Sequence, residues 1–148
     1  MAQSVIAAAF ARYGVISFTG KPTCYFGRVP QTNASGAAIQ PPYVALIDEG
    51  TRPEYDFEHY PIETTSFRFE AYAATLVEVD AILVGIKYGT GGVTDGLGFD
   101  FATFTITGQQ DMECVRVEEL RDQEPPPGWT GGFVYRGVVS YKCEAKVN

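Results

Sequence analysis

The chain has 148 residues, of which 45% are hydrophobic and 20% charged, a composition typical of one folded domain spanning residues 1–148. Its formal net charge of -7 disfavours specific nucleic-acid binding, which requires a basic surface that displaces counterions from the phosphates. No apolar run is long enough to cross a bilayer, so the sequence predicts no membrane partner.

The cysteines are predicted to be reduced thiols. Residues 1–12 lack the positively charged segment of a signal peptide, so we expect the chain to be made and kept in a cytoplasm, where disulfides are rare. Cys114 and Cys143 lie on strands that we expect to pair, but side-chain alternation puts Cys143 on an apolar face and Cys114 on a mixed face. These two are therefore not expected to face each other, and Cys24 is also predicted to be a thiol.

The first third of the chain predicts one helix and one buried strand. Apolar residues recur on one side of residues 4–13, which predicts a helix that Gly14 ends. Residues 29–36 are rich in turn-forming residues and predict a loop. The run 43–48 is apolar on both faces, so we expect a central strand that is covered on both sides.

A turn and an edge strand are predicted next. Residues 49–53 contain Gly50 and Pro53 and read as a turn. Residues 54–60 alternate acidic with aromatic side chains, which is typical of an exposed edge strand.

The middle of the chain predicts a strand that leads directly into a helix. In residues 64–72, apolar and polar side chains alternate with the period of a strand that has one buried face. Thr75 is then placed to accept a hydrogen bond from the amide of Glu78, which predicts a helix N-terminus. Gly89 is placed to end the helix at a positive φ. The helix carries one apolar stripe, formed by Leu76, Val79, Ile82, Leu83 and Ile86.

Two loops and three strands are predicted after the helix. Residues 89–98 are rich in glycine and are expected to form a flexible or contact loop, followed by a β-prone run with an irregularity at 99–107. Residues 112–120 predict a strand, and the proline-rich segment 122–132 predicts an exposed connection. Residues 133–147 predict a long strand that pairs antiparallel with 112–120.

This order of elements predicts an α+β fold with a mainly antiparallel β-sheet and two helices packed on one face. Strands follow strands, so a doubly wound parallel sheet is disfavoured. Val139 and Tyr141 share one side of the last strand and are expected to be buried on the face that the helices cover.

Motifs for chemistry are sparse. His59 is the only histidine, so no histidine-based metal site is expected, and no cofactor is predicted. Strand alternation puts Asp56 and Glu58 on the face opposite His59. No histidine lies near a cysteine in the sequence, which disfavours a nucleophile and base pair and predicts that the chain is not an enzyme. The alternative is a ligand-binding or enzymatic α+β domain whose site is assembled from distant residues such as Asp56, His59 and Cys114.

Candidate residues for protein interfaces lie in the loops and on the acidic edge. Trp129 is the only tryptophan and sits in the proline-rich connection, where it is either an interface anchor or folded back on its own domain. If Arg52 or Arg136 pairs with the acidic edge of a neighbouring chain, that contact is expected to weaken with salt. The full candidate set is Trp129, Phe99, Arg52, Arg136, Glu54, Asp56 and Glu58.

The element order resembles a known family. An N-terminal helix precedes a proline-marked strand at 41–46, a strand–helix unit at 67–82, and two long strands at 115–119 and 135–141. This order is similar to that of the tail-completion, or tail-terminator, proteins of long-tailed bacteriophages and related gene-transfer particles. The resemblance implies a non-catalytic ring, usually hexameric, that caps the tail tube protein and joins it to the head–tail connector protein. It also implies a place in the tail or neck of the virion, after assembly in the host cytoplasm.

Overall fold

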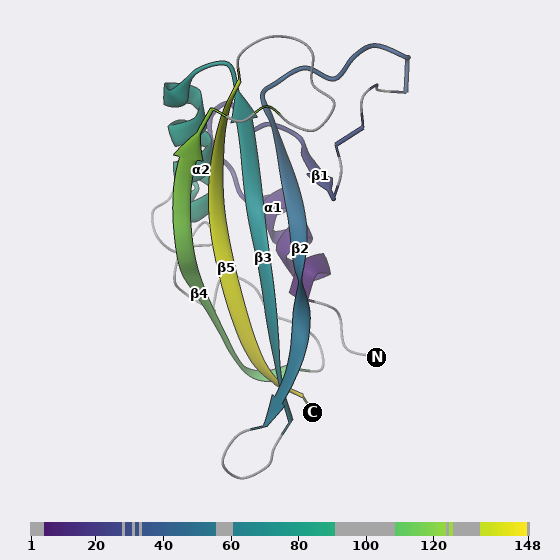
Figure 1. Ribbon diagram of the computed structural model, residues 1–148, viewed down its shortest axis with the longest axis vertical. Coiled ribbons are helices and arrows are strands. Elements are labelled where there is room, and N and C mark those ends of the chain that lie inside the picture. Colours follow the sequence, from purple (N-terminus) through teal and green to yellow (C-terminus); the bar gives the residue numbers. More distant parts are fainter. Residues whose placement is uncertain are drawn as a thin grey trace.

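The computed structural model describes residues 5–27, 29–30, 32, 34–55, 61–90, 109–123, 125 and 134–147. These residues form a five-stranded sheet with the strand order β1-β2-β3-β5-β4, together with two helices, so the predicted α+β fold is confirmed (Figure 1). Only the short pair β1–β2 is parallel, and the other three pairs are antiparallel. The elements are α1 (Val5–Val15), β1 (Cys24–Phe26), β2 (Tyr43–Tyr55), β3 (Pro61–Ala73), α2 (Leu76–Tyr88), β4 (Gln109–Asp122) and β5 (Tyr135–Val147).

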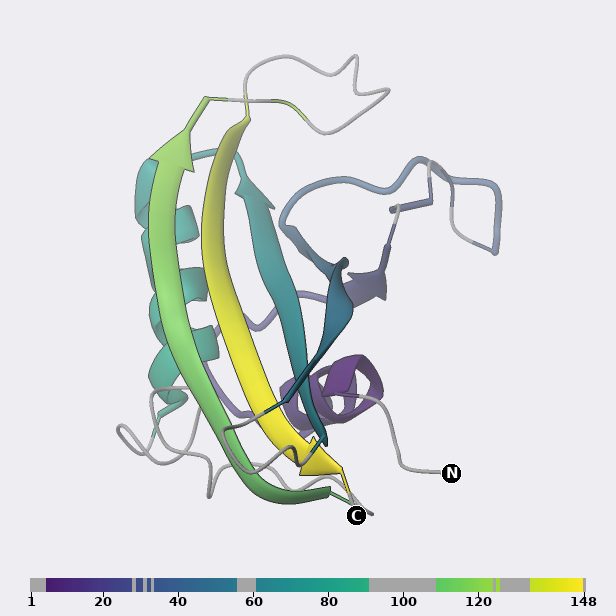
Figure 2. The ribbon, with the colours of Figure 1, turned by 60° about the horizontal axis from the view of Figure 1, so that its bottom comes forward.

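Both helices lie on the same face of the long, curved sheet, as predicted (Figures 1 and 2). They occupy opposite ends of its width. Helix α2 packs on β5 and β3, whereas α1 lies on the side of β1 and β2. The face of the sheet that points away from both helices is called the outer face below.

The strand–helix unit forms as the sequence predicts, except that Leu76 of the predicted apolar stripe is 42% exposed. Phe67, Phe69 and Ala71 of β3 are fully buried against the helices. The hydroxyl of Thr75 accepts a hydrogen bond from the amide of Glu78 at 3.2 Å. Amide groups in the first turn of a helix have no carbonyl partner within the helix, and Thr75 supplies one for Glu78. At the other end Gly89 has a φ of 60°, and its amide donates to the carbonyl of Gly85 at 2.8 Å.

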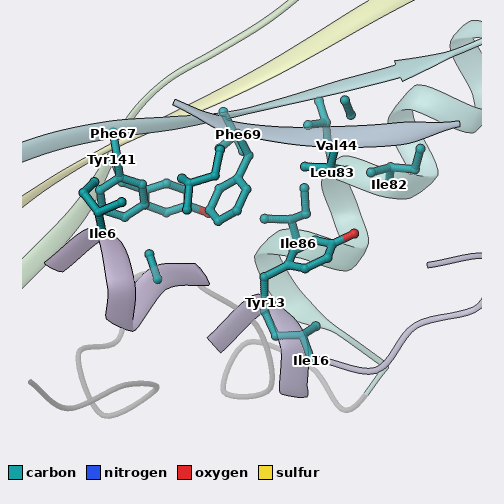
Figure 3. Packing of buried hydrophobic residues seen from close by; sticks show 14 of the residues in the cluster. Ile6, Tyr13, Ile16, Val44, Phe67, Phe69, Ile82, Leu83, Ile86 and Tyr141 are labelled. Atoms are coloured by element: carbon teal, nitrogen blue, oxygen red, sulfur yellow. The ribbon is translucent and has the colours of Figure 1, made fainter. Parts of the chain in front are cut away.

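The core combines aliphatic side chains from both helices and the sheet with a central group of aromatic rings from α1, β3 and β5 (Figure 3). Tyr141 stacks on Phe67 with ring centroids 5.5 Å apart, and Tyr13 of α1 stacks on Phe69 at 5.9 Å. Val139 and Tyr141 are both buried, which confirms the predicted face of β5. The start of β2 is buried on both faces, also as predicted: its residues are Tyr43, Val44, Ala45 and Leu46.

The predicted turn at 49–53 was wrong, because β2 runs through it without a break. The ladder to β3 is shifted between Asp48 and Gly50, where Gly50 takes a φ of 110° and donates its amide to Asp48 Oδ1 at 2.8 Å. The glycine thus provides a bulge instead of a turn, since an extra residue is accommodated while pairing continues on both sides. The sequence also gave no sign of β1, whose three residues are held by pairing with β2.

The predicted separation of Cys114 and Cys143 was also wrong. The two residues lie directly opposite each other in the β4–β5 ladder, both are buried, and the structure joins them by a disulfide. The prediction that Cys114 and Arg116 share one face of β4 was correct. The error lay in which face meets the core, because the face with Cys114 is the one that points toward the helices. Val115 and Val117, which suggested that the core lay on the other side, are exposed.

Two glycines on the helices give a matched test of packing. An added methyl group at Gly85 of α2 would overlap the ring of Phe18, whereas at Gly14 of α1 it would meet no atom within 4 Å. Alanine is favoured over glycine inside a helix, so Gly14→Ala is expected to raise the free energy of unfolding by up to about 1 kcal/mol. Gly85→Ala is expected to lower it by about 1–2 kcal/mol, because overpacking outweighs the helix preference. Urea unfolding measures both, and a stabilised Gly85→Ala variant would contradict this packing.

Candidate interaction surfaces

The outer face of the sheet carries a buried carboxylate in a polar network. Glu70 of β3 is only 6% exposed. It accepts hydrogen bonds from the hydroxyl of Tyr72 and from Nε of Arg68, both at 2.9 Å, and Arg136 of β5 lies 3.5 Å away. Burial, reinforced by the neighbouring Glu70 charge, raises the pKa of Tyr72, so that its hydroxyl stays a donor. The network is satisfied internally and ties β3 to β5.

Arg136, a predicted interface residue, is part of this network. Its guanidinium makes a bidentate contact with the carboxylate of Asp122 of β4, with N–O distances of 3.1 and 2.7 Å. The side chain is 18% exposed and is engaged within its own chain. Arg52, by contrast, is exposed on β2, which leaves it as the more accessible of the two arginines for a contact with another chain.

Most other predicted interface residues lie outside the described part of the chain. Glu54 belongs to β2, but its side chain is not among those described. The remaining candidates, and most of the predicted loops 89–98 and 122–132, fall outside as well. The interface roles assigned to all of them stay predictions. The candidates outside are Asp56, Glu58, Phe99 and Trp129.

An ion-pair network joins edge strand β4 to α2. Glu119 lies 2.6 Å from Nζ of Lys87, 3.3 Å from Arg121 and 3.6 Å from Arg116. Arg121 also pairs with Asp80 of α2. Burial on its own would raise the pKa of Glu119, but the hydrogen bond and charge of Lys87, helped by the two arginines, lower it below the usual value.

The lowered pKa of Glu119 gives a pH-dependent prediction. Because the folded state favours the charged carboxylate, this group stabilises the fold above the ordinary glutamate pKa, and the contribution disappears as the pH falls through the lowered value. Glu119→Gln is therefore expected to lower the free energy of unfolding at neutral pH by about 1–2 kcal/mol. In strong acid the variant and the wild type should be equally stable. Urea titrations at several pH values measure this, and a pH-independent difference would contradict the account.

The side of α2 that points away from the sheet is apolar. Val77 is 79% exposed, and Val84 and Leu76 are 47% and 42% exposed. A helix on the surface of a folded domain normally turns polar residues to water on this side. The group Leu76, Val77 and Val84 is called the α2 face below. This group of exposed apolar side chains is a candidate contact site.

A second exposed apolar site lies between α1 and β1. Phe10 of α1 and Phe26 of β1 are 41% and 58% exposed, and their rings meet edge to face with centroids 6.5 Å apart. Beside them is an open hollow of about 330 Å³, called the α1–β1 hollow below. It is lined by Phe10, Tyr13, Gly14, Lys21, Pro22, Thr23 and Cys24.

The residues that line the α1–β1 hollow include a lysine and an unreactive thiol, besides the hydroxyl-bearing Tyr13 and Thr23. Nζ of Lys21 donates to the carbonyls of Gly14 and Ile16 at 3.1 and 2.8 Å, and lies 4.9 Å from the centre of the Tyr13 ring. It thereby supplies a cation at the C-terminus of α1. Burial raises the pKa of the Cys24 thiol to about 12, so it stays protonated at neutral pH and is a poor nucleophile.

The residues proposed for an alternative catalytic site are not assembled in the described part of the chain. Cys114 is bonded to Cys143 and is no free thiol, while Asp56 and His59 lie outside the described residues. Within those residues, no group of three or more histidine, cysteine, aspartate or glutamate side chains is placed to hold a metal ion. None of the described helices combines the length and the apolar character that crossing a membrane requires.

The sequence reasoning missed both apolar sites, although one signal was present. Helix α2 has apolar residues on all sides, and the stripe that was assigned to the core accounts for only part of them. Val77 and Val84 lie outside that stripe and had no partner assigned. Apolar residues outside the core stripe of a helix are candidates for a contact with a second partner, although α2 also carries the charged residues Glu78, Asp80 and Lys87.

The sequence matches no protein-family model and no curated protein. The fold and the surfaces described above are thus the grounds for assigning a function.

Proposed function

We propose that this chain is a structural, non-catalytic virion protein that caps a bacteriophage tail tube as a ring and joins the tail to the head connector. Its element order is similar to that of tail-completion proteins. The observation that carries the proposal is the pair of exposed apolar sites, one at each end of the width of the sheet.

The two sites suit a ring because copies in a ring meet head to tail. Each copy must then present two unlike surfaces, and the contact closes only at a fixed rotation. Phe10 and Phe26 lie on one side of the chain, and Val77 and Val84 on the other. All four are exposed although the core is already filled by other side chains. They are therefore available for contacts between chains.

The remaining surfaces serve the tube and the connector. A tail terminator needs one surface for its own copies, one for the tail tube protein below and one for the head–tail connector protein above. The outer face of the sheet and the predicted loops 89–98 and 122–132 are the candidates for the latter two. Arg52, exposed on β2, is proposed to pair with acidic residues of a neighbouring chain. We place the protein in the tail or neck of the virion, after assembly in the host cytoplasm.

Ligand binding is the second candidate, and the α1–β1 hollow is the observation that favours it. Its volume of about 330 Å³ falls within the usual range for small-molecule sites. Its wide opening and single charged side chain, Lys21, offer few directed polar groups for recognising a small molecule. The ring protein therefore remains the better-supported proposal.

Tails made with and without this protein test the proposal. Without a terminator, tube growth has no fixed end and no connector can be joined, so electron micrographs should show tubes of irregular length and heads without tails. Restoring the protein should restore tails of one length that are joined to heads. Normal, head-joined tails in its absence would contradict the assignment and leave ligand binding as the leading proposal.

A further inference from the structure

We propose that the α2 face of one copy docks into the α1–β1 hollow of the next copy. The partner is a second copy of this chain, and the contact is head to tail. The inference deepens the proposed function and rests on it, since it names the two surfaces by which neighbouring copies meet in the ring.

The positions of the two surfaces require a second chain. The α2 face lies beside β4 and β5, while the hollow lies beside β1, at the other end of the strand order (Figures 1 and 2). A chain cannot bring its own two surfaces together while its sheet is intact. Contact between unlike surfaces of identical chains repeats from copy to copy, which is the arrangement that generates a ring.

The shapes of the two surfaces are complementary. Val77 projects from the first turn of α2 and is 79% exposed, with Leu76 beside it. Phe10 gives the hollow an apolar rim. At Gly14 the wall of the hollow carries no side chain. A Cβ atom added at Gly14 would meet no atom within 4 Å, so the space next to it is open. A small β-branched side chain fits such a hollow without displacing other groups.

The charges next to the two surfaces are also complementary. Glu78, which follows Val77 in α2, is exposed, and Asp80 is 48% exposed although it pairs with Arg121. The hollow contains the ammonium group of Lys21. Glu78 and Lys21 therefore bring opposite charges to the contact, which favours it and makes it sensitive to salt. Contact between two α2 faces would instead place Glu78 against Glu78, so the head-to-tail pairing is favoured over a symmetric one.

A third exposed apolar site, on edge strand β4, is less suited to the contact. Val115 and Val117 are 41% and 61% exposed. The ladder of β4 is shifted twice, between Gln110 and Glu113 and between Arg116 and Glu118. Such irregularities disrupt a strand edge as a template for pairing with another strand. Val117, exposed to 61%, is therefore the matched control for Val77.

Three variants of the full chain test the contact. Val77→Asp places a carboxylate on the α2 face, and Gly14→Gln fills the hollow with a side chain that α1 accommodates. Val117→Asp makes the same change as Val77→Asp at the control site. Sedimentation velocity at rising protein concentration measures self-association. The wild type and Val117→Asp should associate alike, whereas Val77→Asp and Gly14→Gln should each associate at least about tenfold more weakly.

Mixing two variants gives the decisive result. Val77→Asp keeps an intact hollow, and Gly14→Gln keeps an intact α2 face, so an equimolar mixture should form a pair of chains and nothing larger. Loss of association in Val117→Asp with retention in Val77→Asp would overturn the inference in favour of an edge contact. A mixture that forms no pair, or a wild type that never associates, would also overturn it.

The association test of this contact and the tail-assembly test of the proposed function can fail independently of each other. If tails fail to form normally without the protein but Val77→Asp and Gly14→Gln associate like the wild type, the function stands and this contact is wrong. If the mixture forms pairs but tails are normal without the protein, the contact stands and the function is wrong.

Discussion

Replacing Tyr141 by alanine is expected to lower the free energy of unfolding by about 3–5 kcal/mol, the typical cost of removing a buried aromatic side chain. Tyr141 is 1% exposed, stacks on Phe67 and meets Phe69 edge to face, so its loss opens a cavity in the centre of the core (Figure 3). A domain has only about 5–15 kcal/mol of stability in total. The variant should be insoluble or largely unfolded, as measured by expression yield and urea titration.

Two neighbouring substitutions are the controls for Tyr141. Lys142→Ala, on the outer face, should change stability by less than about 0.5 kcal/mol. Within the described residues the buried hydroxyl of Tyr141 has no hydrogen-bond partner. Tyr141→Phe should therefore be neutral or stabilising, since it removes a buried polar group without removing the ring. Equal losses from Tyr141→Ala and Lys142→Ala would show that the faces of β5 are assigned the wrong way round.

Reducing the bond between Cys114 and Cys143 is expected to have the second largest effect. The bond closes a loop with a sequence separation of 29 residues. In the chain-entropy model, a loop of this length stabilises the fold by about 3–4 kcal/mol. Urea titrations of oxidised and reduced protein measure the difference. Denatured oxidised protein should show one reactive thiol, Cys24, and reduced protein should show three. Three reactive thiols before reduction would contradict the bond.

Local patterns were sufficient to predict much of the fold. The alternation in β3 and the Thr75–Glu78 spacing located the strand–helix unit, because both depend only on residues close in sequence. The side of β5 that carries Tyr141 was predicted for the same reason. These elements fixed the α+β class and the placement of both helices on one face.

Features that depend on distant partners were not predictable in the same way. Residues 49–53 have the composition of a turn, but pairing with β3 keeps them extended, with a bulge next to Gly50. The disulfide was missed because Val115 and Val117 suggested a core face that the structure leaves exposed. Which face of β4 meets the helices is decided by its register with β5, and the sequence of β4 alone does not contain that information.

The candidate surfaces were predicted less well than the fold. Arg136 was predicted as a candidate interface residue; the structure engages it with Asp122 and Glu70 within the chain, and its interface role stays a prediction. Phe10 was missed because apolar residues on one side of a helix are assigned to the core, whereas Val77 lay outside the predicted stripe of α2 and no contact was predicted for it. An apolar residue that faces water is recognised only after the core has been built.

Adding purified protein to tail tubes assembled without it tests the central claim most directly. Electron micrographs are expected to show one closed ring at a single end of each tube, and tubes carrying the ring should no longer lengthen when more tube protein is supplied. Tubes that bind the protein along their sides, or that continue to grow at the same rate in its presence, would contradict the account.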